Sequence, residues 1–495
     1  MGVDWRAIGG LVGSLLAVLS LTLLVPAALA LYDGNALAPF LVPFAGGLVL
    51  GLGLRRLAAG ARSLRAHDGF LAVALVWLAA AVLAAVPYMI EGGDVSSPVD
   101  AFFESMAGVT ATGASNMIDI ESHGRAILFW RSLTQWLGGL GIIVLVLAVL
   151  PRLAVGGRQL MTREVPGPQF DKLAPRMRDT AKRFWLLYAF FTGLEVLVLW
   201  VLGLLDLAPG MDLFNAVCHA FTTLSAGGFS PNARSIEPFG AWAQWTIVVF
   251  MIIAGTNFAL WYRGLFRGLV HFRRDEELRV YLSLMAVGST LITIELLTRD
   301  IGSTHDAVRN GVFQTVSVMT GTGFASTDYA QWTALTFSVL LLLMFVGGMA
   351  GSPTGALKVA RHLLIWKFVG REIRRALHPQ AVMPLRVSGR PVDDQVLASA
   401  VAFTLLYVLV FVIAALLLLL DASQRATFQA EVLDAFAASA ATLGNVGPGL
   451  GFAGPMGSYA PFSDGSKLLM CALMWMGRLE LIPVMVLLTR AYWRS

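Results

Sequence analysis

Four short stretches of this sequence end in small residues and glycine and share one spacing. Each stretch starts with Asp or Asn and reaches its final glycine 13 residues later; they run 100–113, 215–228, 310–323 and 434–447. Glycine and small residues permit an extended or left-handed backbone that turns successive carbonyl oxygens toward one axis. Four such strands together could coordinate a dehydrated cation through main-chain oxygens alone.

The last four residues of each stretch are the candidate ion-binding strands. Any one of them alone is better explained as an ordinary re-entrant packing loop, but four in the same frame favour a shared site, because repeats decide architecture. The candidate residues are Thr110, Ala111, Thr112 and Gly113; Ser225, Ala226, Gly227 and Gly228; Thr320, Gly321, Thr322 and Gly323; and Gly444, Asn445, Val446 and Gly447.

The residue that opens each stretch predicts a helix start. Asp and Asn are favoured N-caps because their side-chain oxygen accepts from first-turn N–H groups. About ten helical residues cover about 15 Å, half the hydrocarbon thickness, so each helix should stop near the middle of a membrane. Its partially negative C-terminal end would then favour a cation there. The predicted caps are Asp100, Asn215, Asn310 and Asp434.

Composition indicates that a membrane surrounds these elements. Of the 495 residues 57% are hydrophobic and only 14% are charged, and the mean hydropathy is +0.72. Long uncharged runs, such as 69–90 and 395–420, exceed the roughly 20 residues that span a bilayer core. Continuous apolar runs in lipid must be helices. The sequence therefore predicts an all-α polytopic membrane protein.

Most of the 36 Lys and Arg residues lie at the chain ends and in alternate loops, at 55–65, 152–183, 263–279 and 358–390. Cytoplasmic loops retain positive charge, so both termini are predicted to be cytoplasmic. The same asymmetry explains the net charge of +5, and no gathering of basic and aromatic residues suggests a nucleic-acid partner. The two cysteines, Cys218 and Cys471, provide neither a disulfide framework nor a thiolate metal site.

Ten spanning helices are expected: two in an N-terminal extra domain and two flanking the short half-membrane helix in each of four repeats. The expected spans are 8–32, 37–58, 70–90, 126–150, 184–205, 240–263, 279–297, 332–357, 395–420 and 467–489. The corresponding domains are the extra domain at 1–66 and pore repeats at 67–155, 156–270, 271–378 and 379–495. The repeats should surround one pseudo-fourfold axis.

With these motifs in place, the chain resembles the TrkH/KtrB family of potassium-uptake channel proteins, specifically its TrkH branch. The likeness covers nearly the whole chain. It depends on Thr-Ala-Thr-Gly113, His219-Ala-Phe-Thr-Thr-Leu-Ser-Ala-Gly-Gly-Phe-Ser230, Met-Thr-Gly-Thr-Gly-Phe-Ala325, Asn-Val-Gly-Pro-Gly449 and Phe129-Trp-Arg-Ser-Leu-Thr-Gln-Trp-Leu-Gly-Gly-Leu-Gly141. The resemblance implies potassium selectivity where all four filters carry glycine, as Gly113 does here, with Rb+ also permeant. It further implies a homodimer and a cytosolic TrkA-like nucleotide-binding regulatory ring, for which the basic loops 152–183 and 358–390 are docking candidates.

A second constriction is expected where the returning helix of repeat three breaks. Proline removes a backbone donor and glycines allow a loop, and the resemblance implies an intramembrane gating loop here. The alternative is that small residues only let helices approach closely. The expected gate residues are Gly347, Gly348, Ala350, Gly351, Ser352, Pro353, Thr354, Gly355 and Arg478.

Arg478 is costly inside a helix and should face a polar interior. The resemblance implies an electrostatic barrier beneath the filter; the alternative is a structural tie through Glu195, Glu295 or a carbonyl. Glu480 lies about 200° around the helix and is not expected to pair with Arg478. His219 is expected to be a structural histidine, and Glu195 and Glu295 have no assigned role.

Together these features predict a potassium-uptake channel subunit of a prokaryotic inner membrane, with K+ as the permeant ion and no cofactor. A secondary transporter coupling K+ to H+ or Na+ is the alternative, although the repeats share one orientation whereas such folds usually have inverted repeats. An enzyme is disfavoured because no metal-binding helix or nucleophile with a base is present, and no nucleotide-binding fingerprint occurs.

Overall fold

The computed structural model describes residues 3–60, 66–149, 177–381, 383–423 and 431–494. Within these residues the regular secondary structure is helical apart from one antiparallel hairpin of two-residue strands, β1 (Arg386–Val387) and β2 (Arg390–Pro391). Seven helical stretches of this described part are long and apolar enough to cross a bilayer. The chain is therefore an all-α membrane protein with several apolar spans, as its composition predicts.

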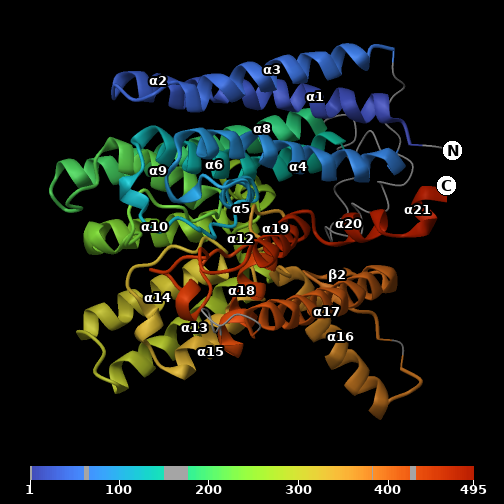
Figure 1. Cartoon of the computed structure of the whole chain (residues 1–495). Coiled ribbons are helices and arrows are strands. Elements are labelled where there is room, and N and C mark those ends of the chain that lie inside the picture. Colours follow the sequence, from blue (N-terminus) through green and yellow to red (C-terminus); the bar gives the residue numbers. More distant parts are fainter. Residues whose placement is uncertain (1–2, 61–65, 150–176, 382, 424–430, 495) are drawn as a thin grey trace.

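Three helices form a layer at the edge of the molecule, drawn at the top of Figure 1: α1 (Trp5–Thr22), α2 (Leu24–Tyr32) and α3 (Ala38–Leu57). The single helix expected over 8–32 is interrupted at Leu23. Pro26 has no N–H to donate to the preceding turn, which explains why the helix is interrupted here. The layer joins the rest of the protein through contacts of α1 and α3 with α4 and of α2 with α6 (Arg125–Val149).

Four groups follow, each with a long helix, a short helix and a returning helix. The first two groups are α4 (Ala66–Glu91), α5 (Pro98–Val109) and α6 (Arg125–Val149), then α8 (Met177–Leu204), α9 (Leu213–Leu224) and α10 (Gly240–Ala254). The last two groups are α13 (Glu276–Thr298), α14 (Thr304–Met319) and α15 (Ala334–Met344), then α17 (Asp394–Ser423), α18 (Val432–Leu443) and α19 (Asp464–Arg478).

Three of the returning helices end early and resume as separate helices. The resuming helices are α11 (Phe258–Arg267) with α12 (Val270–Arg274), α16 (Val359–Leu377), and α20 (Ile482–Leu487) with α21 (Arg490–Arg494). The prediction of continuous helices over 240–263 and 467–489 is therefore wrong. Asn257 starts a new helix by accepting from the Ala259 and Leu260 amides, and Leu481 has a φ of +43° two residues before Pro483. The break expected within 332–357 is present, from Phe345 to Lys358.

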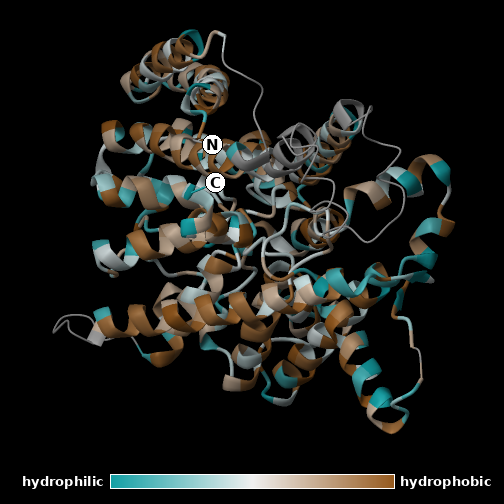
Figure 2. Cartoon of the chain, turned by 90° about the vertical axis from the view of Figure 1, so that its right-hand side faces the viewer, coloured by the Kyte–Doolittle hydropathy of each residue, from teal (hydrophilic) through white to brown (hydrophobic). Residues whose placement is uncertain are grey.

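Two large apolar clusters surround a centre of irregular chain. One joins α10, α13, α14, α15, α17 and α18; the other joins α1 to α6 with α19 and α20. Because α5 packs against α19 as well as α4, the fourth group closes onto the first. Apolar residues cover most of the helical ribbons in Figure 2, and the described residues nearest the two termini lie at the same end of the molecule in Figure 1.

Candidate cation site

The four short helices α5, α9, α14 and α18 each end immediately before a candidate strand, as the spacing predicts, but their N-caps are not the predicted ones. The caps are Ser97, Asp212, Ser303 and Glu431. Asp100, Asn215 and Asp434 lie three residues inside their helices, and Asn310 lies farther in. The cap prediction is wrong because other polar residues precede these positions: the true cap lies three residues before the shared Asx position in three repeats, and seven residues before it in the third repeat.

The shared Asx position has a different role in the first three repeats: it fastens the chain that leaves the strand. The side-chain amide of Asn116 donates to Asp100 Oδ1 at 2.9 Å, and the side-chain amide of Asn232 donates to Asn215 Oδ1 at 3.1 Å. The Ser326 hydroxyl donates to Asn310 Oδ1 at 2.9 Å. In these three repeats the spacing therefore reflects a tertiary contact across the strand, whereas Asp434 accepts from the Glu431 amide in a capping box at the start of α18.

All four strands leave their helices with the same backbone turn. Ala111, Ala226, Gly321 and Asn445 have φ between +50° and +72°, and the amide of the following residue returns to a carbonyl of the last helical turn, as in Thr112 to Ala107 at 2.8 Å. This is the Schellman pattern of helix termination. The final glycine of each strand again has positive φ, so the sign of φ alternates along each strand. The strand amides therefore point back to the helix, and the strand carbonyls point to the opposite side.

The four final glycines close a ring. A Cβ added at any of them would collide with the carbonyl oxygen of the neighbouring strand, so the backbones are in direct contact. The contacts are Gly113 with the Gly227 carbonyl, Gly228 with Thr322, Gly323 with Val446, and Gly447 with Thr112. The strands thus follow one another in chain order, and the fourth returns to the first. The structure brings all four predicted strands together at one place.

The ring is embedded in the protein, with some access at the glycines. The twelve residues that precede the final glycines are buried, whereas Gly113, Gly228 and Gly323 keep partial exposure. Non-helical backbone at such depth is tolerated where it lines a polar path. The arrangement could therefore present main-chain oxygens to a dehydrated cation on a central axis.

Side chains hold the ring from behind. Gln135 Nε2 donates to the Gly227 carbonyl at 2.8 Å, and its Oε1 accepts from the Phe229 amide at 3.0 Å. The Tyr459 hydroxyl donates to the Gly447 carbonyl at 2.8 Å. Asn445 Nδ2 donates to Thr112 Oγ1 at 2.8 Å and so ties the fourth strand to the first.

A buried ion pair links the first two strands, and the sequence analysis did not identify it. Arg131 on α6 and Glu104 on α5 are both almost fully buried, with Nη2 and Oε1 2.8 Å apart. Arg131 Nη1 also donates to the Ser230 carbonyl at 3.0 Å, and Glu104 Oε2 accepts from the backbone amide of Asn116 at 3.0 Å. Two charged residues in membrane-embedded helices were the available signal, since intramembrane charges are rarely incidental.

The expected gate loop lies directly on the ring. A Cβ at Gly355 would collide with the Gly444 carbonyl, and one at Gly321 would lie 3.9 Å from the Gly355 amide nitrogen. The loop is fastened to the break after α10, because the Met349 amide donates to the Gly255 carbonyl at 2.8 Å. The expected gate residues from Gly347 to Gly355 therefore form one non-helical segment next to the second residue of the third strand and the first residue of the fourth.

Arg478 is tied to carbonyls. Its Nη1 donates to the Pro353 carbonyl of the loop and its Nη2 to the Gly138 carbonyl of α6 at 2.9 Å. In the described part of the chain no carboxylate pairs with it; Glu295 pairs with Arg299 at 3.3 Å instead. Glu195 lies fully buried on α8. The guanidinium therefore joins the loop to the first repeat just beneath the ring.

Glu480 does not pair with Arg478, as expected, but with two cationic side chains that follow the loop. Its carboxylate lies 2.6 Å from Lys358 Nζ and 2.7 Å from Arg361 Nη2. This triad joins the break after α19 to the start of α16.

His219 has partners on both ring nitrogens, the Asn215 carbonyl at 2.8 Å and the Ser230 hydroxyl at 3.0 Å.

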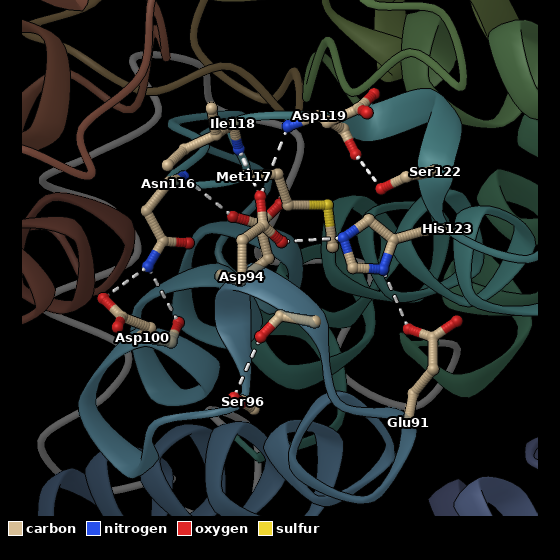
Figure 3. A network of polar contacts seen from close by, with 12 residues as sticks. Glu91, Asp94, Ser96, Asp100, Asn116, Met117, Ile118, Asp119, Ser122 and His123 are labelled. Carbon is tan, nitrogen blue, oxygen red and sulfur yellow. Dashed lines mark hydrogen bonds and ion pairs between the residues drawn. The ribbon is translucent and has the colours of Figure 1, made fainter.

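A polar network holds the segment that leaves the first strand (Figure 3). His123 lies between two carboxylates, with Nδ1 3.0 Å from Glu91 Oε2 and Nε2 2.8 Å from Asp94 Oδ1. Asp94, in the short helix η1 (Gly93–Val95), also accepts from the Ile118 amide. The hydrogen bond with Glu91 raises the pKa of His123 above 6.5, although burial acts in the opposite direction. The network favours a protonated imidazole between the two acids.

Comparison with known proteins places this geometry in a family. The family model described as TrkH, cation transport protein, matches residues 48–494. The Trk system potassium uptake protein TrkH of Vibrio parahaemolyticus is 37% identical over 503 residues and that of Escherichia coli 36% identical over 501, each covering 100% of both chains. The crystal structure of the potassium transporter TrkH from Vibrio parahaemolyticus superposes with a TM-score of 0.87 at 34% identity, over 99% of this chain and 100% of that one. The chain therefore belongs to the TrkH family of cation transport proteins, which are multi-pass membrane proteins and not enzymes.

Proposed function

We propose that this chain is a potassium-uptake channel subunit that passes K+ through a single carbonyl-lined pore. The observation that carries the proposal is the closed ring, in which each final glycine contacts the carbonyl of the next strand. Relatives that match over their full length are named potassium uptake proteins. Rings of backbone carbonyls select K+ by replacing its hydration shell. The selectivity filter is assigned to residues 110–113, 225–228, 320–323 and 444–447.

The architecture we propose has ten membrane crossings. The seven apolar spans are supplemented by α6 and by the two interrupted pairs, α15 with α16 and α19 with α20. An extra domain at 1–66 then precedes pore repeats at 67–155, 156–270, 271–378 and 379–495, arranged about a pseudo-fourfold axis. The distribution of Lys and Arg supports cytoplasmic termini in a cell inner membrane.

Gating is assigned to the loop from Gly347 to Gly355 together with Arg478. The contact of Gly355 with the Gly444 carbonyl supports a position across the cytoplasmic entrance of the filter. Arg478 adds a positive charge at the same place. We further propose a homodimer regulated by a cytosolic TrkA-like nucleotide-binding subunit; most of the basic docking candidate 152–183 lies outside the described residues, whereas 358–390 comprises α16 and the hairpin.

Uptake through such a pore needs no coupled chemistry. A membrane potential contributes about 2.3 kcal/mol per charge per 100 mV, which is sufficient for accumulation. A secondary transporter would instead couple K+ to H+ or Na+. Reversal potentials that follow the K+ gradient alone, at varied pH and Na+, would support the channel; a shift with either second gradient would support coupling.

Rubidium flux into vesicles tests the filter. Wild type should take up Rb+ with little competition from Na+, and Gly113→Ser should lose that discrimination, because a side chain at this φ of +80° would displace the Gly227 carbonyl. Gly370→Ala is a suitable control, since a Cβ at Gly370 meets open space. Unchanged selectivity in Gly113→Ser would count against the filter assignment.

A further inference from the structure

Two consecutive carboxylates at the start of α13 contact two different parts of the protein. Glu277 Oε1 accepts from the Ala350 amide at 2.6 Å, in the middle of the gate loop. Glu276 Oε2 accepts from the Ser388 amide at 2.9 Å, in the turn between β1 and β2. One helical turn therefore contacts both the gate loop and the hairpin.

The hairpin is held to this turn by more than one contact. The Glu276 backbone amide donates to the Ser388 hydroxyl at 3.2 Å, and Lys367 Nζ on α16 lies 2.5 Å from Glu276 Oε1. Lys367 also donates to the Arg386 carbonyl of β1 at 2.7 Å. Ser388 has a φ of +48°, so the turn is fixed in a left-handed conformation that presents its amide to Glu276.

The other contacts of the gate loop described above are made within the body of the protein. Arg478 reaches it from α19, and Gly255 reaches it from the break after α10. Glu277 is different because its neighbour in the chain, Glu276, is hydrogen-bonded to the β1–β2 hairpin. Adjacent Cα atoms are about 3.8 Å apart, and both residues belong to one hydrogen-bonded helical turn, so displacement of one side displaces the other.

We propose that Glu277 is a positioning residue that holds the gate loop beneath the filter, and that Glu276 couples this hold to the β1–β2 hairpin. A cytosolic partner that moves the hairpin would thereby loosen the loop. The inference depends on the proposed function, because it assigns a mechanical input to the gate. It identifies a route from the surface to the loop that passes through α13, in addition to α16, which continues directly from the loop and also contacts the hairpin through Lys367.

Partner-free Rb+ flux into vesicles tests the hold. Glu277→Ala removes the acceptor and should raise basal flux about tenfold, the ratio that corresponds to about 1.4 kcal/mol and lies within the net contribution of a single hydrogen bond. Glu277→Gln keeps an acceptor oxygen at the same place and should remain within about twofold of wild type. Glu372→Ala, which removes a carboxylate paired with Arg371 on α16, is the matched control and should change nothing.

A double mutant tests the coupling. Glu276→Ala should raise basal flux in the wild-type background and add nothing to Glu277→Ala, because contacts in series cannot be released twice. Additive effects of the two substitutions would overturn the coupling, and unchanged flux in Glu277→Ala would overturn the hold. Should Glu277→Ala not fold, Glu276→Ala alone decides: raised flux supports the route, and unchanged flux overturns it. Failure of the proposed function would look different, since wild type and all variants would then lack Rb+ flux that excludes Na+.

Discussion

The filter ring and the layer beneath it are built on different principles. In the ring, four strands repeat one backbone turn and one glycine contact, although their side chains differ from Thr to Ser to Gly. In the layer beneath, a single loop from the third group is held by side chains that occur once, Arg478 and Glu277 among them. Under the proposed function, ion selection would depend on repeated main-chain geometry, whereas gating would depend on contacts that break the symmetry.

The same contrast is visible in the returning helices. α6 continues without interruption, while α10 and α19 are interrupted over three residues each and α15 is followed by a loop from Phe345 to Lys358. Three interruptions thus occur at corresponding places, but only the one after α15 is long enough to lie across the ring. Loop length, and not the presence of a break, distinguishes the repeat to which we assign the gate.

The largest expected effect concerns the ion pair behind the ring. Arg131→Met leaves Glu104 buried without its partner and should lower the free energy of unfolding by about 3–5 kcal/mol. Chemical denaturation in detergent would measure it. The double variant Arg131→Met, Glu104→Leu should recover much of the loss, because no uncompensated charge remains. A double variant as unstable as the single one would contradict this explanation.

The ring itself should be equally sensitive in every strand. Gly323→Ala combines a left-handed φ of +80° with a collision against the Val446 carbonyl, at a cost of about 2–5 kcal/mol. Rb+ flux should fall strongly, and Gly228→Ala should behave alike. If one glycine tolerated alanine while the others did not, the fourfold equivalence of the ring would be lost.

The layer beneath should respond in the opposite direction. Arg478→Gln removes a positive charge and weakens the tie to the Pro353 carbonyl, so basal Rb+ flux should rise about tenfold, equivalent to about 1.4 kcal/mol. Arg309→Gln, which removes a cation paired with Asp306 near the start of α14, serves as the control. Reduced flux together with a lower folded yield would instead identify Arg478 as a structural tie.

The smallest effect is expected at the polar network around His123. Because the pKa of His123 is raised above 6.5 by Glu91, its stabilisation is fully present below that value and is lost as the pH rises through the higher native pKa. Partly exposed pairs contribute about 1 kcal/mol or less. Melting temperatures of wild type and His123→Asn should therefore differ at about pH 6 and converge at about pH 9. A constant difference across this range would argue against protonation of His123.

Much of the site could be predicted because its signals are local. The glycines of the four strands have a fixed spacing, and the apolar runs define the spans without knowledge of their neighbours. The Asx residues show the limit of this reasoning. Their spacing is real, but Asp100 and Asn215 serve contacts to Asn116 and Asn232 rather than helix starts, and a sequence pattern does not distinguish these uses.

The membrane class, the helical fold and the positions of the four strands follow from the amino-acid sequence, since burial in lipid and left-handed backbone each demand particular residue types. The cyclic order of the strands, the pairing of Arg131 with Glu104, and the partners of Arg478 and Glu277 emerge from the folded protein. These contacts join residues from 27 to 340 positions apart. Side chains so distant in sequence meet only when the helices pack, and no local pattern records which of them will be neighbours.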